Sequence, residues 1–364
     1  MKKIFLLLTL VLLACSDDDG NAPFEETNPP TLSISVISST SSNNGIIEMD
    51  IQTNGGTITT YNLTQTIGVP LTATPTYSKN NQATWYESSF GQVDVWQKNL
   101  ESGNSTELTS VCDVTGEFPL MVDNSVYNVF IGTRYQDNDG IHGRMRIFNG
   151  SACILETLTD FRIRSIFELD NEVLIYCTSN AANNVQKVVK MKLETAEVVD
   201  ELVLSNSAKI AVDGDTMHVF FVNADYNTYS VSNFNFISNS SLQLNYDDVP
   251  FGFINSEFVE NTMYTRVTYA QPGLIPNGPA LLDLQSGELI TPYNLLYDIN
   301  NNLNAISTSF YDPTGTYDVN VASNIVVVGY FNGANEFGIV VSNFNAEIFE
   351  VIPLDYFPSE IFIR

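Results

Sequence analysis

A short turn motif that recurs along the chain constrains the fold more than any other feature of the sequence. Each copy has an apolar residue, an acidic residue and a turn residue before a strand opened by Val or Met, as in Leu169-Asp170-Asn171-Glu172-Val173. The turn residues of the six copies, two of which match more weakly, are Asn81, Asn124, Asn171, Gly214, Asn261 and Asn324. Successive copies are 43, 47, 43, 47 and 63 residues apart, so the last interval holds an insertion of about 16 residues. A period in the forties indicates a chain built from repeated structural units.

A second repeat gives the same period. The segment Val231-Ser232-Asn233-Phe234-Asn235 recurs without change at residues 341–345, which is 110 residues later. Without the insertion of about 16 residues this distance is 94, or twice 47. A further segment, Asp283-Leu284-Gln285-Ser286-Gly287-Glu288, resembles the turn of WD40- and YVTN-like bacterial propeller repeats. That resemblance implies a β-propeller.

The segments between the turns have the pattern of β-strands. Polar and apolar residues alternate at 46–51 and at 185–193, and Val, Ile, Tyr, Phe and Thr are abundant. Apart from the N-terminal segment, no window of twelve or more residues shows a sustained apolar period of 3.6, so we expect little helix. Each unit then has four strands, and because one such sheet cannot bury both faces alone, neighbouring units must stack. The sequence predicts an all-β fold, a β-propeller with six blades between about residues 70 and 354.

Both ends of this domain are expected to form one further blade. The tail 358–364 looks like the first strand of a unit, and the segments 32–36, 46–51 and 57–63 supply its other three strands. Such a blade closes the ring and covers strand edges that are otherwise exposed. We therefore predict seven four-stranded blades closed by strands from both termini, with six and eight blades as alternatives. A pair of β-sandwich domains is the competing architecture, but no break in composition after Pro30 marks a domain boundary.

The N-terminal residues resemble a bacterial lipoprotein signal. Lys2 and Lys3 precede the apolar run 4–13, which is too short to span a bilayer, and Leu12-Leu13-Ala14-Cys15 resembles a lipobox. In that family the signal is cut before the Cys, which is then acylated. The following Ser16-Asp17-Asp18-Asp19 resembles the acidic export signal of Bacteroidetes surface lipoproteins.

These resemblances imply a signal peptide at 1–14, then lipidated Cys15 with an acidic, flexible tether at 15–30, and the propeller domain at 31–364. They also imply a lipid-anchored protein of the outer membrane that faces outward. An ordinary signal peptide with a chance Cys is the alternative.

Composition excludes several function classes. With 15 basic and 42 acidic residues the chain has a net charge of −27, which argues against a nucleic-acid partner. Its two His residues and four Cys residues leave little material for metal sites, and we predict no metal, cofactor or catalytic residue. The polar segment Asp137-Asn138-Asp139-Gly140 is interpreted as an Asx turn, because the later ligands of a calcium loop are missing. His142 lies in the same loop, and His218 lies in a strand, where packing is the favoured role.

Three cysteines remain in the folded domain after Cys15, namely Cys112, Cys153 and Cys177. All lie in apolar segments, which favours buried free thiols. Export would allow one disulfide bond, but the spacing does not select a pair.

Strand alternation places the longer loops of all blades on one face. The first and third turns of each blade are short and share one face, whereas the second turns and the links between blades lie on the other, together with the insertion. Loops on a rigid scaffold commonly carry recognition, and tyrosines suit stacking against sugars or peptides. The ligand-binding candidates on this face are Tyr135, Tyr269, Tyr293, Tyr297 and Tyr311.

We expect a non-catalytic binding or scaffold module for a glycan, peptide or protein partner. The scarcity of basic residues favours a neutral or cationic one. An extracellular propeller hydrolase or lyase acting on polysaccharide or protein is the alternative, and the shortage of Arg and His disfavours it.

Overall fold

The structure is a computed structural model. It describes residues 31–39, 45–79, 81–125, 128–158, 161–179, 185–204, 208–221, 224–243, 257–268, 277–291, 294–306, 312–332 and 336–364. Internal contacts divide the chain into two units, Met1–Thr31 and Leu32–Arg364, and the fold described below is that of the second. The predicted signal peptide, Cys15 and the tether lie outside the described residues.

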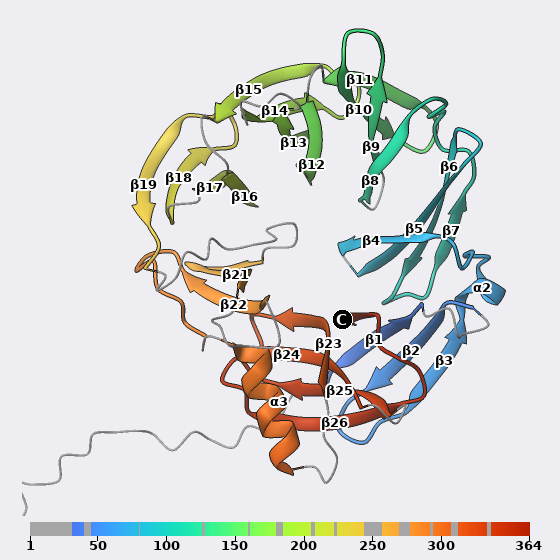
Figure 1. The fold of residues 1–364 in the computed structure, drawn as a ribbon, viewed down its shortest axis with the longest axis vertical. Coiled ribbons are helices and arrows are strands. Elements are labelled where there is room, and N and C mark those ends of the chain that lie inside the picture. Colours follow the sequence, from blue (N-terminus) through green and yellow to red (C-terminus); the bar gives the residue numbers. More distant parts are fainter. Residues whose placement is uncertain are drawn as a thin grey trace, which may run out of the picture. The chain divides into compact units, whose positions relative to one another are not determined.

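Seven antiparallel sheets form the domain, and we number them as blades 1 to 7 (Figure 1). The strands of blades 1 to 3 are β4 (Thr74–Lys79), β5 (Gln82–Ser89), β6 (Gln92–Asn99) and β7 (Ser105–Leu108); β8 (Phe118–Asn124), β9 (Val129–Gln136), β10 (Ile141–Phe148) and β11 (Cys153–Leu158); and β12 (Phe161–Glu168), β13 (Glu172–Ser179), β14 (Gln186–Lys192) and β15 (Val198–Leu204). Blades 4 and 5 consist of β16 (Ala208–Asp213), β17 (Thr216–Phe221), β18 (Asp225–Ser230) and β19 (Phe236–Ser241); and β20 (Phe258–Val259), β21 (Thr262–Thr268) and β22 (Asn277–Asp283). Blades 6 and 7 consist of β23 (Asp312–Asn320), β24 (Ile325–Phe331), β25 (Phe337–Ser342) and β26 (Ile348–Leu354); and β27 (Glu360–Ile363), β1 (Ser33–Ser38), β2 (Ile47–Gln52) and β3 (Ile58–Asn62).

The sheets are arranged as a seven-bladed propeller, which confirms the predicted fold. In Figure 1 the first strands β4, β8, β12, β16 and β23 lie nearest the common axis of their blades, and the later strands follow outward. Blade 5 has three strands in the described residues, and an isolated bridge between Leu282 and Leu289 occupies the place of its fourth strand. The two described helices are α2 (Leu63–Thr66) and α3 (Leu295–Ile306).

Both sequence repeats mark equivalent turns. The six turn residues of the first motif lie at or beside the connection between the first and second strands of blades 1 to 6. The repeated five-residue segment is the whole connection between β18 and β19 in blade 4, whereas in blade 6 its first two residues end β25 and its last three begin the connection to β26. Its phenylalanine is buried in both copies, with Phe234 8% exposed and Phe344 3% exposed, and each packs into a core between blades. The repeat therefore encodes a turn that inserts an aromatic side chain between neighbouring sheets.

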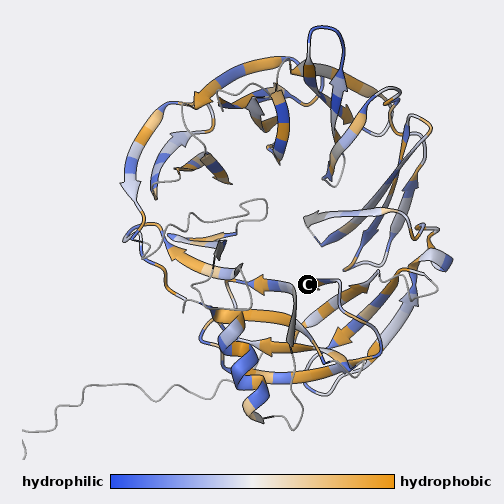
Figure 2. Cartoon of the chain, in the orientation of Figure 1, coloured by the Kyte–Doolittle hydropathy of each residue, from blue (hydrophilic) through white to orange (hydrophobic). Residues whose placement is uncertain are grey.

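The hydrophobic core is divided among the interfaces between blades. One cluster joins Val327 and Ile339 of blade 6 to Ile34 and Met49 of blade 7, and Figure 2 shows hydrophobic residues along the strands of both. The other clusters likewise combine residues of adjacent blades. Each sheet thus buries its apolar side chains against its neighbours, as the repeat model requires.

Strands from the two ends of the domain close the ring, as predicted. β27 pairs with β1 through Ile34 opposite Ile363 and Val36 opposite Ile361. Ile361 is 5% exposed and packs in the cluster between blades 6 and 7. The backbone N–H of Ile363 also donates to Asp318 Oδ2 of β23 at 2.6 Å, which ties the closing strand to blade 6.

An ion pair and a hydrogen bond join blade 7 to blade 1 on its other side. The Arg364 guanidinium binds Asp50 of β2 and the carbonyl oxygen of Leu100, which follows β6. Lys98 of β6 pairs with Glu48 of β2, whose side chain is only 2% exposed. These contacts add to the chain link 63–73, which leads from β3 of blade 7 to β4 of blade 1.

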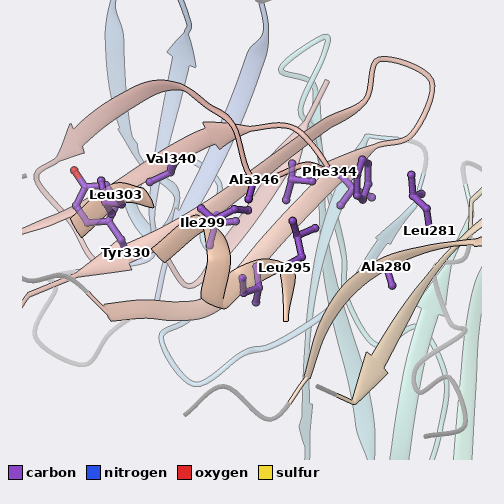
Figure 3. Packing of buried hydrophobic residues seen from close by; sticks show 13 residues of the cluster. Ala280, Leu281, Leu295, Ile299, Leu303, Tyr330, Val340, Phe344 and Ala346 are labelled. Atoms are coloured by element: carbon purple, nitrogen blue, oxygen red, sulfur yellow. The ribbon is translucent and has the colours of Figure 1, made fainter. Parts of the chain in front are cut away.

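The insertion before blade 6 forms α3, a 12-residue helix that the sequence analysis did not predict. Leu295, Leu296, Ile299 and Leu303 are buried in a cluster with residues of blades 5 and 6. Figure 3 shows Leu303 beside Tyr330 and Ile299 near Ala346. The expectation that no such helical window exists was wrong, because a run rich in Asn hides the few leucines that form the buried face. No helix in the described ranges is long and apolar enough to cross a bilayer.

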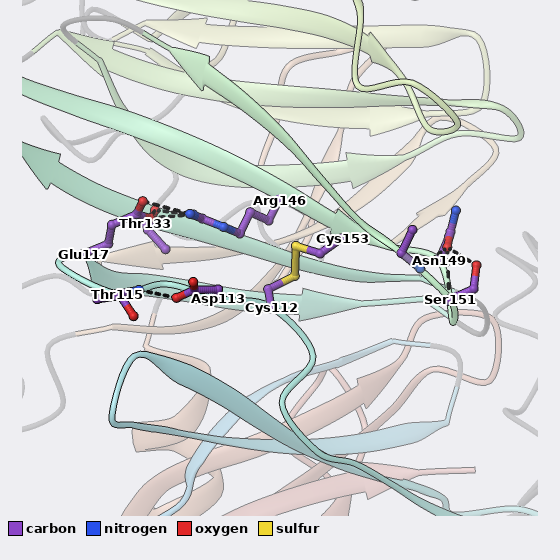
Figure 4. Close-up of a disulfide and its surroundings, with 10 residues drawn as sticks. Cys112, Asp113, Thr115, Glu117, Thr133, Arg146, Asn149, Ser151 and Cys153 are labelled. Atoms are coloured by element: carbon purple, nitrogen blue, oxygen red, sulfur yellow. Dashed lines mark hydrogen bonds and ion pairs between the residues drawn. A yellow bond between two sulfur atoms is a disulfide. The ribbon is translucent and has the colours of Figure 1, made fainter.

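The cysteines also correct the sequence analysis. Cys112, in the link between blades 1 and 2, is joined by a disulfide bond to Cys153 at the start of β11, with their Cα atoms 5.6 Å apart (Figure 4). The favoured interpretation as free thiols was therefore wrong for this pair. It is correct for Cys177, which is free and buried, and burial raises the pKa of its thiol to about 12.

Candidate functional site

Two phenylalanines stand out on the surface of blades 1 and 2. Phe90 is fully exposed and Phe118 is 70% exposed, which makes them the most exposed large apolar side chains among the described residues. Phe90 lies in the turn between β5 and β6, and Phe118 opens β8. Both positions belong to the face formed by the second turns and the links between blades, which we call the loop face.

Backbone contacts bring these two positions close together. Val114 N–H donates to the Gly91 carbonyl oxygen at 2.7 Å, and Gln92 forms a β-bridge with Asp113. A β-carbon at Gly91 would lie 2.9 Å from the Thr115 α-carbon. The turn that carries Phe90 therefore contacts the link between blades 1 and 2, which leads to Phe118. We call Phe90 and Phe118, on the turn and at the end of the link that contact each other here, the apolar patch.

The turn that carries Phe90 is strained. Phe90 has φ 50° and Gly91 has φ 78°, and the two residues connect the paired positions Ser89 and Gln92. A two-residue hairpin turn with positive φ at both positions favours Asn-Gly. A bulky residue in the left-handed region costs about 1–2 kcal/mol. Phe90 is therefore exposed to solvent at a position where its backbone conformation is unfavourable.

Tyr135, one of the predicted ligand-binding residues, lies in blade 2 next to the apolar patch. It is half-buried near the end of β9, opposite His142 of β10, and their ring centroids are 6.1 Å apart. The Arg144 guanidinium carbon lies 3.8 Å from the centroid of the Tyr135 ring. Such cation–π stacking holds the ring in one orientation.

The buried carboxylate of Glu117 binds Arg144, the residue that stacks on Tyr135. The Glu117 side chain is 1% exposed and accepts hydrogen bonds from Arg144, Arg146 and Thr133, of which the bond from Arg146 Nη2 is 2.8 Å long (Figure 4). Burial alone would raise the pKa of Glu117, but these hydrogen bonds outweigh it and leave the pKa below its ordinary value. Glu117 therefore stays ionised, and its charge is matched by two guanidinium groups.

His142 continues the network to the rim of blade 2. Its Nε2 lies 3.0 Å from Asp137 Oδ1, which also accepts the backbone N–H groups of Asp139 and Gly140 at 2.9 and 3.2 Å. The predicted Asx turn is thereby confirmed. The hydrogen bond to His142, followed by that from Asp139, lowers the pKa of Asp137, so this carboxylate is ionised at neutral pH. Within the described part of the chain, His142 Nδ1 is buried without a hydrogen-bond partner.

Only part of the predicted Tyr set can be placed. Tyr297 lies on α3 and is 39% exposed. Tyr269, Tyr293 and Tyr311 lie outside the described residues. Tyr135 is in blade 2, whereas α3 follows blade 5, so the structure does not bring Tyr135 and Tyr297 together.

Sequence reasoning missed Phe90 and Phe118. The only signal for Phe90 was a Phe-Gly pair between two strand patterns, at a place where turns normally carry polar residues. Phe118 lies between Glu117 and Pro119 at the start of a strand, where an apolar residue is expected to be buried. Its exposure follows from its place at the end of the sheet.

The second histidine of the chain, His218, has a packing role. His218 stacks on Phe258, with ring centroids 5.7 Å apart, and burial lowers its pKa, in agreement with the role that its strand position favoured. In the residues that the structure describes, no three His, Cys, Asp or Glu side chains gather in a way that could hold a metal ion.

Comparisons with known proteins show no family for this chain and only distant similarity to solved structures. No family model matches the sequence, and no curated protein is similar to it. Among solved structures, a protein from Lactobacillus plantarum has 11% identity and a TM-score of 0.49, with 92% of this chain and 100% of that chain covered. Apo AztD from Citrobacter koseri has 11% identity and a TM-score of 0.47 over 92% of this chain and 98% of that one. The computationally designed protein Ika8 has 12% identity and a TM-score of 0.44 over 91% and 90% of the two chains. At these values the assignment of the fold rests on the seven sheets themselves.

Proposed function

We propose that this protein is an outer-membrane lipoprotein, anchored through Cys15 and facing outward, whose propeller is a non-catalytic binding module. The observation that carries the binding role is the apolar patch, where Phe90 and Phe118 project from adjoining blades of a rigid scaffold. Exposed apolar side chains gathered in one place are typical of interaction sites. The anchor is supported by the resemblance of residues 12–19 to a lipobox followed by an acidic export signal.

The polar groups beside the apolar patch support binding rather than catalysis. Glu117 is held between two arginines, and Asp137 is held by His142 and two backbone N–H groups. A general acid or base needs a carboxyl or imidazole group that can exchange a proton with a substrate. Here these groups fix the positions of Tyr135 and of the loops.

The anchor is tested by fractionation. The wild-type protein is expected in the detergent phase with the outer membrane, whereas Cys15→Ala is expected to be soluble or uncleaved. Replacing residues 17–19 by Ala should leave the lipid in place but prevent digestion by protease added outside the cells. A wild-type protein without an acyl chain by mass spectrometry would contradict the anchor, and unchanged protease access in the alanine variant would contradict the export signal alone.

The binding role is tested with glycan and peptide arrays. The probe is a soluble form lacking residues 1–15, since residues 32–364 form a compact unit of their own. Phe118→Ser should lose most of the array signal, because it removes the apolar side chain beside Phe90. The control is Val203→Ser on the outer strand of blade 3, where Val203 is 64% exposed. Equal signals from wild type and Phe118→Ser would show that the apolar patch is not the binding surface.

A further inference from the structure

The two-residue turn between β5 and β6 presents the fully exposed side chain of Phe90 to solvent. We propose that Phe90 inserts into an apolar pocket on another protein, and that the rim of this pocket carries Lys or Arg side chains. This inference rests on the proposed binding function and names the class of its partner.

The exposure of Phe90 favours a protein over a sugar. A sugar ring stacks on an aromatic face that lies in the protein surface with polar groups around it. Phe90 is instead fully exposed at the tip of a two-residue turn, so its ring is not laid against the chain. A projecting apolar side chain gains most by filling a pocket from which water is excluded, and aromatic residues in such pockets dominate many protein interfaces.

The support beneath Phe90 is rigid. β5 and β6 pair without a register shift from Gln82 opposite Asn99 to Ser89 opposite Gln92. Trp85 and Val95 of these strands are buried, and the turn is further fixed by the bond from Val114 to Gly91. Little conformational entropy is then lost when the turn binds, which favours affinity.

Stability does not explain why a phenylalanine occupies this position. Its φ of 50° is unfavourable for a bulky residue, whereas Asn before Gly adopts this turn readily. Full exposure also means that the ring contributes no core packing. Backbone strain of this kind is found mainly at functional positions.

The acidic residues around Phe90 indicate which charge the rim of the partner's pocket carries. Glu87, Asp94 and Asp113 lie beside the turn on β5, β6 and the link to blade 2. Each has a hydrogen bond from a neighbouring Thr or Ser residue, as in the 2.7 Å bond from Ser110 N–H to Asp94, but none forms an ion pair in the described ranges. Hydrogen bonds from Thr115 lower the pKa of Asp113, which keeps it ionised. These negative charges attract a basic partner and repel an anionic membrane surface.

The test begins with cross-linking from the full-length, lipidated protein in the cells that make it. A photoreactive benzoyl-phenylalanine is placed at position 90 and, as control, at position 236 on β19, where the native Phe236 is 58% exposed. We expect one protein to be linked from position 90 and not from position 236. That protein is then purified and its affinity measured for wild type, Phe90→Asn and Phe236→Asn.

We expect the Phe90 substitution to lower the affinity for the partner without lowering the stability of the fold. Phe90→Asn should weaken binding by about 30-fold or more, the effect of removing a central anchor, while its melting temperature equals or exceeds that of wild type. Phe236→Asn should bind as wild type does, and raising the salt concentration should weaken the wild-type complex.

Several outcomes overturn the inference. A lipid or glycan adduct at position 90, a cross-link to a second copy of this chain, or unchanged affinity of Phe90→Asn would each do so. If the arrays still show binding that depends on Phe118, only the role of Phe90 fails. If neither assay shows binding through the apolar patch, the proposed function fails as well.

Discussion

Deleting residues 358–364 removes the strand that closes the propeller, and the structure gives the size of the effect. Burying a large apolar side chain stabilises a protein by about 1.5–3 kcal/mol. Ile361 is 5% exposed, and Phe362 and Ile363 are half-buried, so their loss amounts to about 4 kcal/mol. The strand also forms a four-pair ladder with β1 and gives its Ile363 N–H to Asp318. We expect the free energy of unfolding to fall by about 4–6 kcal/mol.

Guanidinium denaturation of the deletion variant and the full-length protein at pH 4.5, where ionisation of Glu360 costs the folded state little, measures this difference. The point variant Ile361→Ala should lose about 2–4 kcal/mol, and Ile290→Ala, at a site 54% exposed, should stay within about 0.5 kcal/mol of wild type. A deletion variant within about 1 kcal/mol of wild type would refute the view that β27 holds the ring closed.

Three further predictions concern charges and the disulfide bond. Burial raises the pKa of Glu360 from 4.5 to about 7, so the folded state binds this proton more tightly and stability falls as the pH rises from about 4.5 to 7. Glu360→Gln should therefore raise the free energy of unfolding, measured by urea titration, by about 3 kcal/mol at pH 8 and hardly at all at pH 4.5. The stability of this variant should still depend on pH, because burial also raises the pKa of Asp318 to about 7. Cys153→Ser opens a disulfide that spans 41 residues and should cost about 2–4 kcal/mol, a difference from wild type that should vanish when both are unfolded in a reducing agent. Lys98→Met leaves the buried Glu48 carboxylate without its partner and should cost about 3–5 kcal/mol by chemical denaturation, whereas the double variant with Glu48→Leu should recover most of the loss.

The architecture was predictable because it repeats. Turn residues such as Asn171 and Gly214 recur with a fixed period, and a period can be read from one sequence without knowledge of contacts. The closing strand was predictable for a related reason, since the segment around Ile361 has the pattern of a first strand and the segments 32–36, 46–51 and 57–63 have the pattern of the other three. The helix α3 belongs to no repeat, and its Asn-rich sequence concealed it.

The candidate site was less predictable, because it depends on contacts between residues that are separated in the sequence. Tyr135 was placed on the loop face by strand alternation, but nothing in the sequence connects it to Arg144 or to Glu117. The disulfide joins Cys112, in the link that leads to blade 2, to Cys153 of β11, and three cysteines allow three pairings. Phe90 was missed because exposure is a property of the folded surface, and an apolar residue near strands is normally expected to be buried.

The closing blade also sets the order in which this protein can mature. Ile34 pairs with Ile363, so β1 to β3 leave the ribosome long before β27, the innermost strand of the same blade. Until β27 arrives, β1 has an unpaired edge, and part of the apolar surface of blade 7 has nothing to pack against. Such an edge can capture strands of other chains. The propeller is therefore most prone to aggregation during synthesis and, if it is exported, during transport, when the chain is long but the ring is still open.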